Sequence, residues 1–171
     1  MRHGAWSMLG AVGVLLLTSG CVAIEAGHEG VMVEQPFFFG HGGVDPAPSK
    51  TGRVWVAPTT KVIEVDVRPL QYSEHFDIIS AENAPVSFDA FMIANVVESR
   101  SPELISRYGP NWYQNNVKEA FRTFVREEVQ RYPLFQLTTD PTTRTKLQDA
   151  IAREVQNKLI DKQNMPIRLN R

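Results

Sequence analysis

Two histidines in glycine-rich turns are the first residues of this sequence whose types suggest chemistry. His28 lies in "GHEG" beside Glu29, and His41 lies in "GHGG". Imidazole and carboxylate groups are common zinc ligands, so these three side chains suggest a metal site. Their spacing matches no usual zinc pattern, and the sequence favours the alternative of solvated turn histidines. We therefore expect no bound metal and no other cofactor.

Hydrolase chemistry is the second possibility. "HGG" at His41 is similar to the oxyanion loop of lipases, but that mechanism needs a serine in G-x-S-x-G, which the sequence lacks. Ser73 and Ser87 have no such glycines around them. Glu64 and Asp66 share one face of an expected strand, where two carboxylates could act as general acid and base. Because each of these catalytic patterns is incomplete, the sequence favours a protein that is not an enzyme and has no small-molecule substrate.

Cys21, the only cysteine, ends a segment with the features of a secretory signal. Arg2 and His3 precede an apolar run over residues 5–17, and small residues lead to the cysteine. The run is shorter than the roughly 20 apolar residues that cross a bilayer. Residues 1–20 are therefore predicted to be a signal peptide. The segment resembles the lipobox of bacterial lipoproteins, although Thr18 stands where leucine is usual; an uncleaved short anchor or a buried free thiol are the alternatives.

Lipidation of Cys21 would attach the mature chain to a membrane, with about 0.8 kcal/mol from each buried methylene. It would also leave no free thiol, which excludes cysteine nucleophilic catalysis. We expect a lipid-anchored protein of the bacterial cell envelope that faces the periplasm or the exterior. Val22 follows the cysteine where an aspartate would favour inner-membrane retention, so the outer membrane is favoured.

Candidate contact residues follow the predicted anchor. Phe37, Phe38 and Phe39 lie in a glycine- and proline-rich loop, where they either cap an edge of the core or contact the bilayer or a partner. Nucleic acid is not an expected partner, because 18 basic and 19 acidic residues give a formal charge of −1.

Alternation of apolar and polar residues predicts strands in the first half of the chain. Two short strands separated at Gly27 and Gly30 are expected within residues 21–35, and further strands at 53–58 and 61–68. Residues 74–80 and 85–98 are expected to form two strands joined by a turn at Glu82 and Asn83. The second of these should lie mid-sheet under helices, because it has one unbroken apolar face, formed by Val86, Phe88, Ala90, Met92, Ala94 and Val96.

After Glu98 the spacing of apolar residues becomes helical. A first helix is expected from an N-cap at Ser101 to Gly109. A second, at 111–132, should leave Glu127 and Glu128 in solvent and bury a stripe formed by Val117, Phe121, Phe124, Val125 and Val129. A third should start at the N-cap Asp140 and bury Leu147, Ile151, Val155 and Leu159. Strands followed by helices indicate an α+β fold, with an antiparallel-rich sheet and packed helices after the signal peptide.

In this order the segments resemble the SPFH or Band 7 superfamily of stomatin, prohibitin and flotillin proteins, in a bacterial lipoprotein version. "AGHEGVMV" is similar to the family's opening strand, and "VIEVDVRPLQY" and "NAPVSFDAFMIANV" are similar to two later strands. "YGPNWYQNNVKEAFRTFVRE" is similar to the helical half. The resemblance implies an N-terminal strand and Gly/Pro-rich loop at 21–52, a strand-rich first half of the domain at 53–100, and a helical second half at 101–171. That half is expected to end before the family's last strand and coiled coil.

The resemblance implies a membrane-anchored scaffold that organises membrane microdomains or modulates membrane protein complexes and proteases. Its partners would be membrane lipid, through acylated Cys21, together with further copies of itself or membrane proteins and proteases. Because no heptad segment is present, a truncated remnant without separate activity is one alternative. An extracytoplasmic hydrolase or metal-binding lipoprotein using the turns at His28 and His41 is the other.

Overall fold

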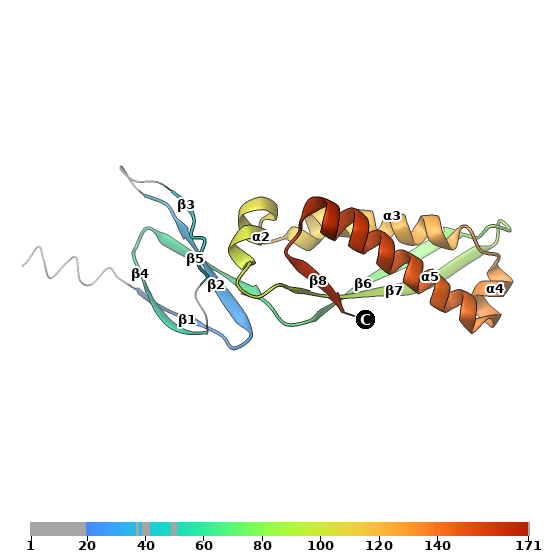
Figure 1. The fold of residues 1–171 in the computed structure, drawn as a ribbon, viewed down its shortest axis with the longest axis horizontal. Helices are drawn as coiled ribbons and strands as arrows, with labels where there is room; N and C mark the ends of the chain where they lie inside the picture. Colours follow the sequence, from blue (N-terminus) through green and yellow to red (C-terminus); the bar gives the residue numbers. More distant parts are fainter. Residues whose placement is uncertain (1–19, 37, 39–41, 49–50, 171) are drawn as a thin grey trace, which may run out of the picture.

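Strands fill the first half of the chain and helices most of the second half in the computed structural model, which describes residues 20–36, 38, 42–48 and 51–170 (Figure 1). The strands are β1 (Gly20–Ile24), β2 (His28–Glu34), β3 (Gly43–Val44), β4 (Gly52–Val56), β5 (Thr60–Asp66), β6 (Leu70–Ile79), β7 (Pro85–Val96) and β8 (Ile167–Asn170). The helices are α2 (Ser101–Tyr108), α3 (Lys118–Val129), α4 (Leu134–Thr139) and α5 (Pro141–Glu154), with π-helical segments η1 (Tyr113–Val117) and η2 (Val155–Asp161). The predicted α+β fold is confirmed, while the predicted signal peptide lies outside the described residues except for Gly20.

The described strands form three sheets, and all of their pairings are antiparallel. β1 pairs with β4, the order β3–β2–β5 forms a second sheet, and the order β6–β7–β8 forms a third. β1 and β2 begin the predicted segment 21–52, yet they pair with β4 and β5, which lie mostly in the segment 53–100. Only the pairing of β2 with β3 stays within the first segment. The two small sheets lie at one end of the elongated molecule, and the helices cover the third sheet (Figure 1).

The first two strands are separated at only one of the two expected glycines. Gly27, with φ of 81°, lies in the turn between β1 and β2. Gly30 instead lies within β2, opposite Glu64. A Cβ atom at Gly30 would come within 2.5 Å of the Ile24 side chain, so this glycine permits a close approach of β1 to β2. The predicted break at Gly30 is wrong because that approach, and not a turn, requires the glycine.

The long hairpin of β6 and β7 agrees with the sequence analysis. Asn83 adopts φ of 59° in its turn, and the Ser80 N–H donates to the Ala84 carbonyl at 2.9 Å. Asparagine tolerates this left-handed conformation better than most residues. β7 lies between β6 and β8, so its predicted position in the middle of a sheet is confirmed.

Helix starts and the last strand show where local sequence patterns mislead. Asp140 caps α5 as predicted, and its carboxylate accepts from the Thr142 and Thr143 N–H groups at 2.9 and 3.2 Å. Ser101 is wrong as an N-cap, because it is already helical and its hydroxyl bonds elsewhere. The short α4 was not predicted because it buries no side chain. We expected the helical half to end before a last strand, whereas the structure places β8 there, paired with residues 93–96 of β7.

The apolar stripe of α3 packs against the sheet, but its two phenylalanines differ. Phe121 is 3% exposed and meets Phe76 of β6 edge to face, with ring centroids 6.4 Å apart. Phe124 is only half-buried, and the Lys158 ammonium lies over its ring at 5.3 Å. Expecting equal burial of both was wrong, because Phe124 faces η2 near the surface rather than the sheet.

Truncation of the two phenylalanines should separate their contributions. Phe121→Ala should lower the free energy of unfolding by about 3–5 kcal/mol, since it removes a ring that is 3% exposed and packed in the core. Phe124→Ala is the matched control and should cost clearly less, because solvent already reaches that side chain. Urea melts of both variants measure the difference, and an equal loss would contradict the packing described here.

Candidate functional site

A buried carboxylate fixes the first helix to the N-terminal sheet. Glu29 on β2 is 5% exposed, and it accepts hydrogen bonds from the Ser99 N–H at 2.6 Å and the Ser101 hydroxyl at 2.5 Å. A buried carboxylate is costly unless its oxygens are bonded, so these partners define where α2 begins. Glu29 therefore positions a helix rather than a metal ion. His28 was expected in a solvated turn, but that is wrong, because it is the first residue of β2 and is paired with Asp66 of β5.

A second buried carboxylate, Glu74 on β6, joins the sheet to α3 and η1. Its oxygens accept from Tyr113 Oη and Arg122 Nη1, both at 3.1 Å, and Lys118 Nζ lies 3.4 Å away. Burial alone would raise the pKa of Glu74, but the hydrogen bonds from Arg122, Tyr113 and Lys118 outweigh it and lower that pKa. Burial and the neighbouring Glu74 raise the pKa of the Tyr113 hydroxyl, which stays protonated as the donor.

The sequence analysis considered Glu29 only as a metal ligand, and it missed Glu74, although a signal for Glu74 was available. Glu74 has the same strand parity as Phe76 and Ile78, which marks it as facing the helices. Glu128 was expected in solvent, yet it is buried and accepts from Arg131 at 2.6 Å. That expectation was wrong because the helix turns Glu128 toward the packed face.

The candidate metal and acid–base residues do not converge. Asp66 is bonded to Arg68 through two contacts of 2.9 and 2.6 Å, and these bonds lower the pKa of its carboxyl group. His28 lies 3.7 Å from Asp66, whereas Glu64 is exposed. His41 lies outside the described residues. Within the part of the chain that the structure describes, no three His, Cys, Asp or Glu side chains are grouped to hold a metal ion.

A polar cluster on the open face of the β6–β7 hairpin contains the residue types of a serine hydrolase. His75 Nδ1 lies 2.8 Å from Asp89 Oδ1, and His75 Nε2 lies 3.4 Å from Ser87 Oγ. The Ser87 hydroxyl, however, donates to Asp77 at 2.7 Å, which directs its proton away from the imidazole. Hydrogen bonding to Asp89, together with the charge of Asp77, raises the pKa of His75. These features suit a network of surface charges better than a general base that activates serine.

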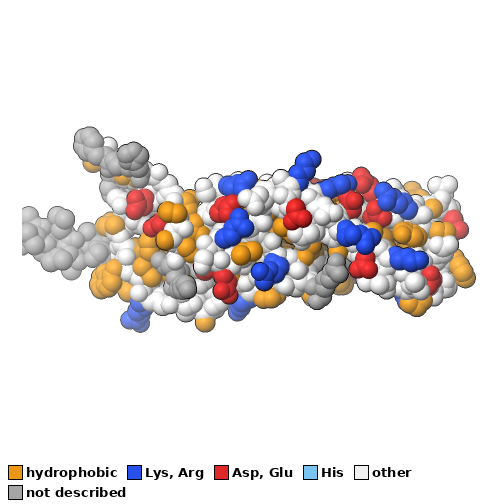
Figure 2. Space-filling model, viewed as in Figure 1, with side chains coloured by type: hydrophobic (Ala, Val, Ile, Leu, Met, Phe, Trp, Pro, Cys, Tyr) orange, Lys and Arg blue, Asp and Glu red, His pale blue; other side chains and the backbone are white. Residues whose placement is uncertain are grey.

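The predicted anchor residue lies at the end of the molecule formed by the small sheets. Cys21 is exposed on β1 and is paired with Trp55 of β4, whose side chain is 73% exposed. Figure 2 shows further hydrophobic side chains gathered at this end. Phe38 is 91% exposed, while Phe37 and Phe39 lie outside the described residues. Because the Phe38 side chain is exposed, it does not cap an edge of the core, which was one of the two expectations for it.

Replacing Glu74 tests how strongly it holds the helices. Glu74→Gln should lower the free energy of unfolding by about 1–3 kcal/mol at pH 7, since Arg122 and Lys118 lose a charged acceptor. Because the folded pKa is lowered, the stabilisation is present above the unfolded pKa and is lost as pH falls through the folded pKa. Urea melts at pH 7 and pH 3 should therefore show a difference that shrinks in acid. A pH-independent difference would contradict the charge argument.

Titration of His75 tests the polar cluster. Its imidazole should titrate above the ordinary pKa of 6.5 and move back toward that value in Asp89→Asn. Stabilisation from a raised pKa is complete below the unfolded pKa and is lost as pH rises through the folded pKa, so the cluster should contribute least in alkaline solution. NMR titration of the ring protons measures the shift, with Asp45→Asn as a control outside the cluster. An unchanged midpoint in Asp89→Asn would show that the 2.8 Å contact does not form in solution.

Comparison with known proteins tests the family resemblance that the sequence suggested. A search of curated proteins found no match to this chain. The family model described as SPFH domain / Band 7 family matches residues 22–169, which covers every described strand and helix from β1 to β8 except at their outer ends. The match confirms the resemblance to the SPFH or Band 7 superfamily found in the sequence. The chain therefore belongs to the SPFH domain / Band 7 family, a family of membrane-associated, scaffold-type proteins.

Proposed function

We propose that this protein is a lipid-anchored scaffold of the bacterial cell envelope, held on the membrane through acylated Cys21. Family membership supports the scaffold role. The exposed position of Cys21 on β1 is the main observation in favour of lipid anchoring. A cysteine at the surface is accessible for acylation without unfolding of the domain. None of the helices in the described part of the chain is both long and apolar enough to cross a bilayer.

The arrangement of Cys21 and Trp55 supports a defined orientation on the membrane. Both side chains are exposed at one end of an elongated domain, whose helices extend away from that end (Figure 1). Tryptophan favours the boundary between lipid and water because its ring is apolar and its N–H can stay hydrated. With acyl chains at Cys21, Trp55 would touch the headgroups, and Phe38 would add a second apolar contact. The helical layer would then be presented to partners.

The remaining parts of the proposal follow from the anchor. The domain faces the periplasm or the exterior, and Val22 after the cysteine favours the outer membrane. The scaffold acts without chemistry of its own, by self-association or by holding membrane proteins and proteases within microdomains. The pairing of Asp66, one of the two candidate acid–base residues, with Arg68 at 2.9 and 2.6 Å supports this reading over a hydrolase.

Fractionation of cells tests the anchor. Cys21→Ser should move the protein from the membrane fraction to the soluble fraction, because the acceptor of the acyl chains is gone. Thr18→Leu is the matched control; it places leucine at the usual lipobox position and should leave the protein on the membrane. If Cys21→Ser stays membrane-bound after a carbonate wash, acylation of Cys21 does not hold the protein there.

A further inference from the structure

A cavity of about 190 Å³ lies where the β3–β2–β5 sheet meets the helical half of the chain. Its lining comes from β5, the first residues of β6, α2 and the segment between α2 and η1, all within residues 64–112. Two aromatic residues, Tyr72 and Trp112, and two acidic residues, Glu64 and Asp66, take part, and the other lining residues are apolar. None of the described residues that line the cavity is Lys, Arg or His. The lining therefore combines aromatic rings with negative charge.

Two aromatic rings form a corner of the cavity. The ring centroids of Tyr72 and Trp112 lie 5.6 Å apart, and the ring planes meet at 73°. Tyr72 also stacks on Tyr113 at 4.0 Å, and the Tyr113 hydroxyl donates to the buried Glu74. These contacts fix the two rings from within the protein. Because the face of an aromatic ring carries negative potential, such a corner attracts a cation.

The free edge of β5 forms a second wall. β5 is the outer strand in the order β3–β2–β5, so among the described residues one of its edges has no strand partner. The Val67 N–H donates to the Gly27 carbonyl, and the backbone groups of alternate residues in an antiparallel strand point to the same side. The backbone groups of Val65 therefore point toward β2, and those of Glu64 and Asp66 point outward. Both residues can thus offer carbonyl oxygens to a cation, whatever the direction of their side chains.

Negative charge exceeds positive charge beside the cavity. Arg68 bonds to the Asp66 carboxylate at 2.9 and 2.6 Å and so balances one of the two acidic groups. Glu64 is exposed and forms no ion pair within the part of the chain that the structure describes. The field of Asp66 reaches the aromatic corner, since burial and, to a smaller extent, the charge of Asp66 raise the pKa of the Tyr72 hydroxyl. A cation in the cavity would balance the charge of Glu64.

The size of the cavity limits what can enter it. Sites for drug-sized ligands usually enclose about 300–1,000 Å³, so a cavity of about 190 Å³ suits one small group. A bare metal ion such as Ca²⁺ needs about six to eight oxygen ligands, which a wall of rings and aliphatic side chains does not offer. Aromatic rings beside acidic groups are instead an environment in which proteins recognise alkylammonium groups.

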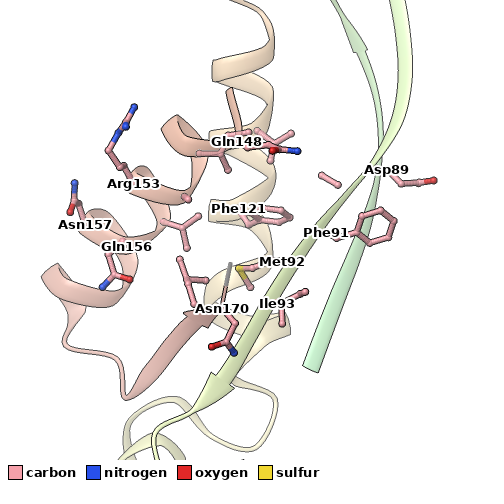
Figure 3. Close-up of a pocket in the computed structure, with 16 residues that line it drawn as sticks. Asp89, Phe91, Met92, Ile93, Phe121, Gln148, Arg153, Gln156, Asn157 and Asn170 are labelled. Carbon is pink, nitrogen blue, oxygen red and sulfur yellow. The ribbon is translucent and has the colours of Figure 1, made fainter. Parts of the chain in front are cut away.

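A larger groove of about 470 Å³, between β7 and α5, has a different chemistry (Figure 3). Its lining includes the basic side chain of Arg153 and the amides of Gln148 and Gln156. Figure 3 shows Phe121 on the helix side of β7, whereas Phe91 points the other way, so these two lining rings do not form a corner. The features that attract a cation are therefore combined in the smaller cavity.

We propose that the smaller cavity binds the ammonium group of a small organic cation of the choline type, in which the charged nitrogen carries methyl groups. The methyl groups pack on Tyr72 and Trp112, and the positive charge lies near Glu64 and the carbonyl oxygens of the β5 edge. Such a group occurs both in free solutes and in lipid headgroups, and its chemistry at the site is the same in either case. The lining does not include Cys21, so the site does not depend on acylation.

Titration of the full chain with tetramethylammonium tests the site. Cys21→Ser in this chain prevents acylation, and NMR follows the indole N–H of Trp112, with that of Trp55 as an internal reference. The Trp112 signal should shift and saturate, while the Trp55 signal stays in place. Choline should act in the same way. Its uncharged isostere, in which a tert-butyl group replaces trimethylammonium, should bind at least about tenfold more weakly, because the attraction between ring and cation is lost. Sodium chloride at equal ionic strength is the control for screening and should shift neither signal.

Four variants connect the shift with the cavity. Glu64→Gln removes an exposed charge and should weaken binding at least about threefold. Glu34→Gln removes an exposed carboxylate on β2 outside the cavity, so it is the matched control and should bind normally. Tyr72→Leu removes one ring of the corner and should weaken binding at least about tenfold, whereas Tyr72→Phe keeps the ring and should bind more tightly than Tyr72→Leu. Should Tyr72→Leu unfold, the comparison of Glu64→Gln with Glu34→Gln still decides the question.

Vesicles distinguish the two sources of the ammonium group. Cosedimentation of the Cys21→Ser chain with phosphatidylcholine vesicles, reversed by free choline, would assign the site to a lipid headgroup. A Trp112 shift with choline, without cosedimentation that choline reverses, would assign the site to a free solute. Both results support the site. A failure of membrane anchoring in cells would concern Cys21 and would leave either result intact.

Three results would overturn the proposal. One is the absence of a Trp112 shift with both tetramethylammonium and choline. Another is equal binding of the uncharged isostere, which would show that the cavity is merely apolar. The third is unchanged binding by both Glu64→Gln and Tyr72→Leu, which would place the cation elsewhere.

Discussion

The packing of one apolar face of β7 beneath α3 and η2 is the interaction on which the rest of the domain depends. β7 pairs with β6 along most of its length and with β8 at its end, so it holds the sheet together. Its even-numbered residues form the part of the core that the sheet contributes. Burial of this face provides the main favourable free energy, since each core side chain contributes about 1.5–3 kcal/mol. On this face Met92, Ala94 and Val96 are buried, whereas Val86, Phe88 and Ala90 are half-buried.

Two buried carboxylates then determine how the helices sit on this sheet. Glu29 reaches from the N-terminal sheet to the start of α2, and Glu74 reaches from β6 to η1 and α3. Hydrophobic contact is not directional, so it cannot by itself select one placement of a helix. Charged hydrogen bonds are directional and costly to break when buried, so these groups select the observed placement. The polar cluster at His75 lies on the opposite, open face and does not take part.

The exposed Cys21 and a groove of about 470 Å³ lined by β7, α5 and η2 lie in different parts of the structure. Cys21 and Trp55 belong to the small sheets at one end, whereas the groove lies beside α5 on the third sheet (Figure 1).

The sequence by itself determined the element types and the family. Alternation over residues 85–96 identified β7, Asn83 identified the hairpin turn, and Asp140 identified the start of α5, because each depends on local stereochemistry. Only the tertiary structure decided the roles of Gly30, Ser101 and Glu128, whose neighbours are distant in sequence or lie across a packed face. Strand register is a long-range property set by which strands meet, so no local pattern in β7 could have revealed that β8 pairs with its residues 93–96.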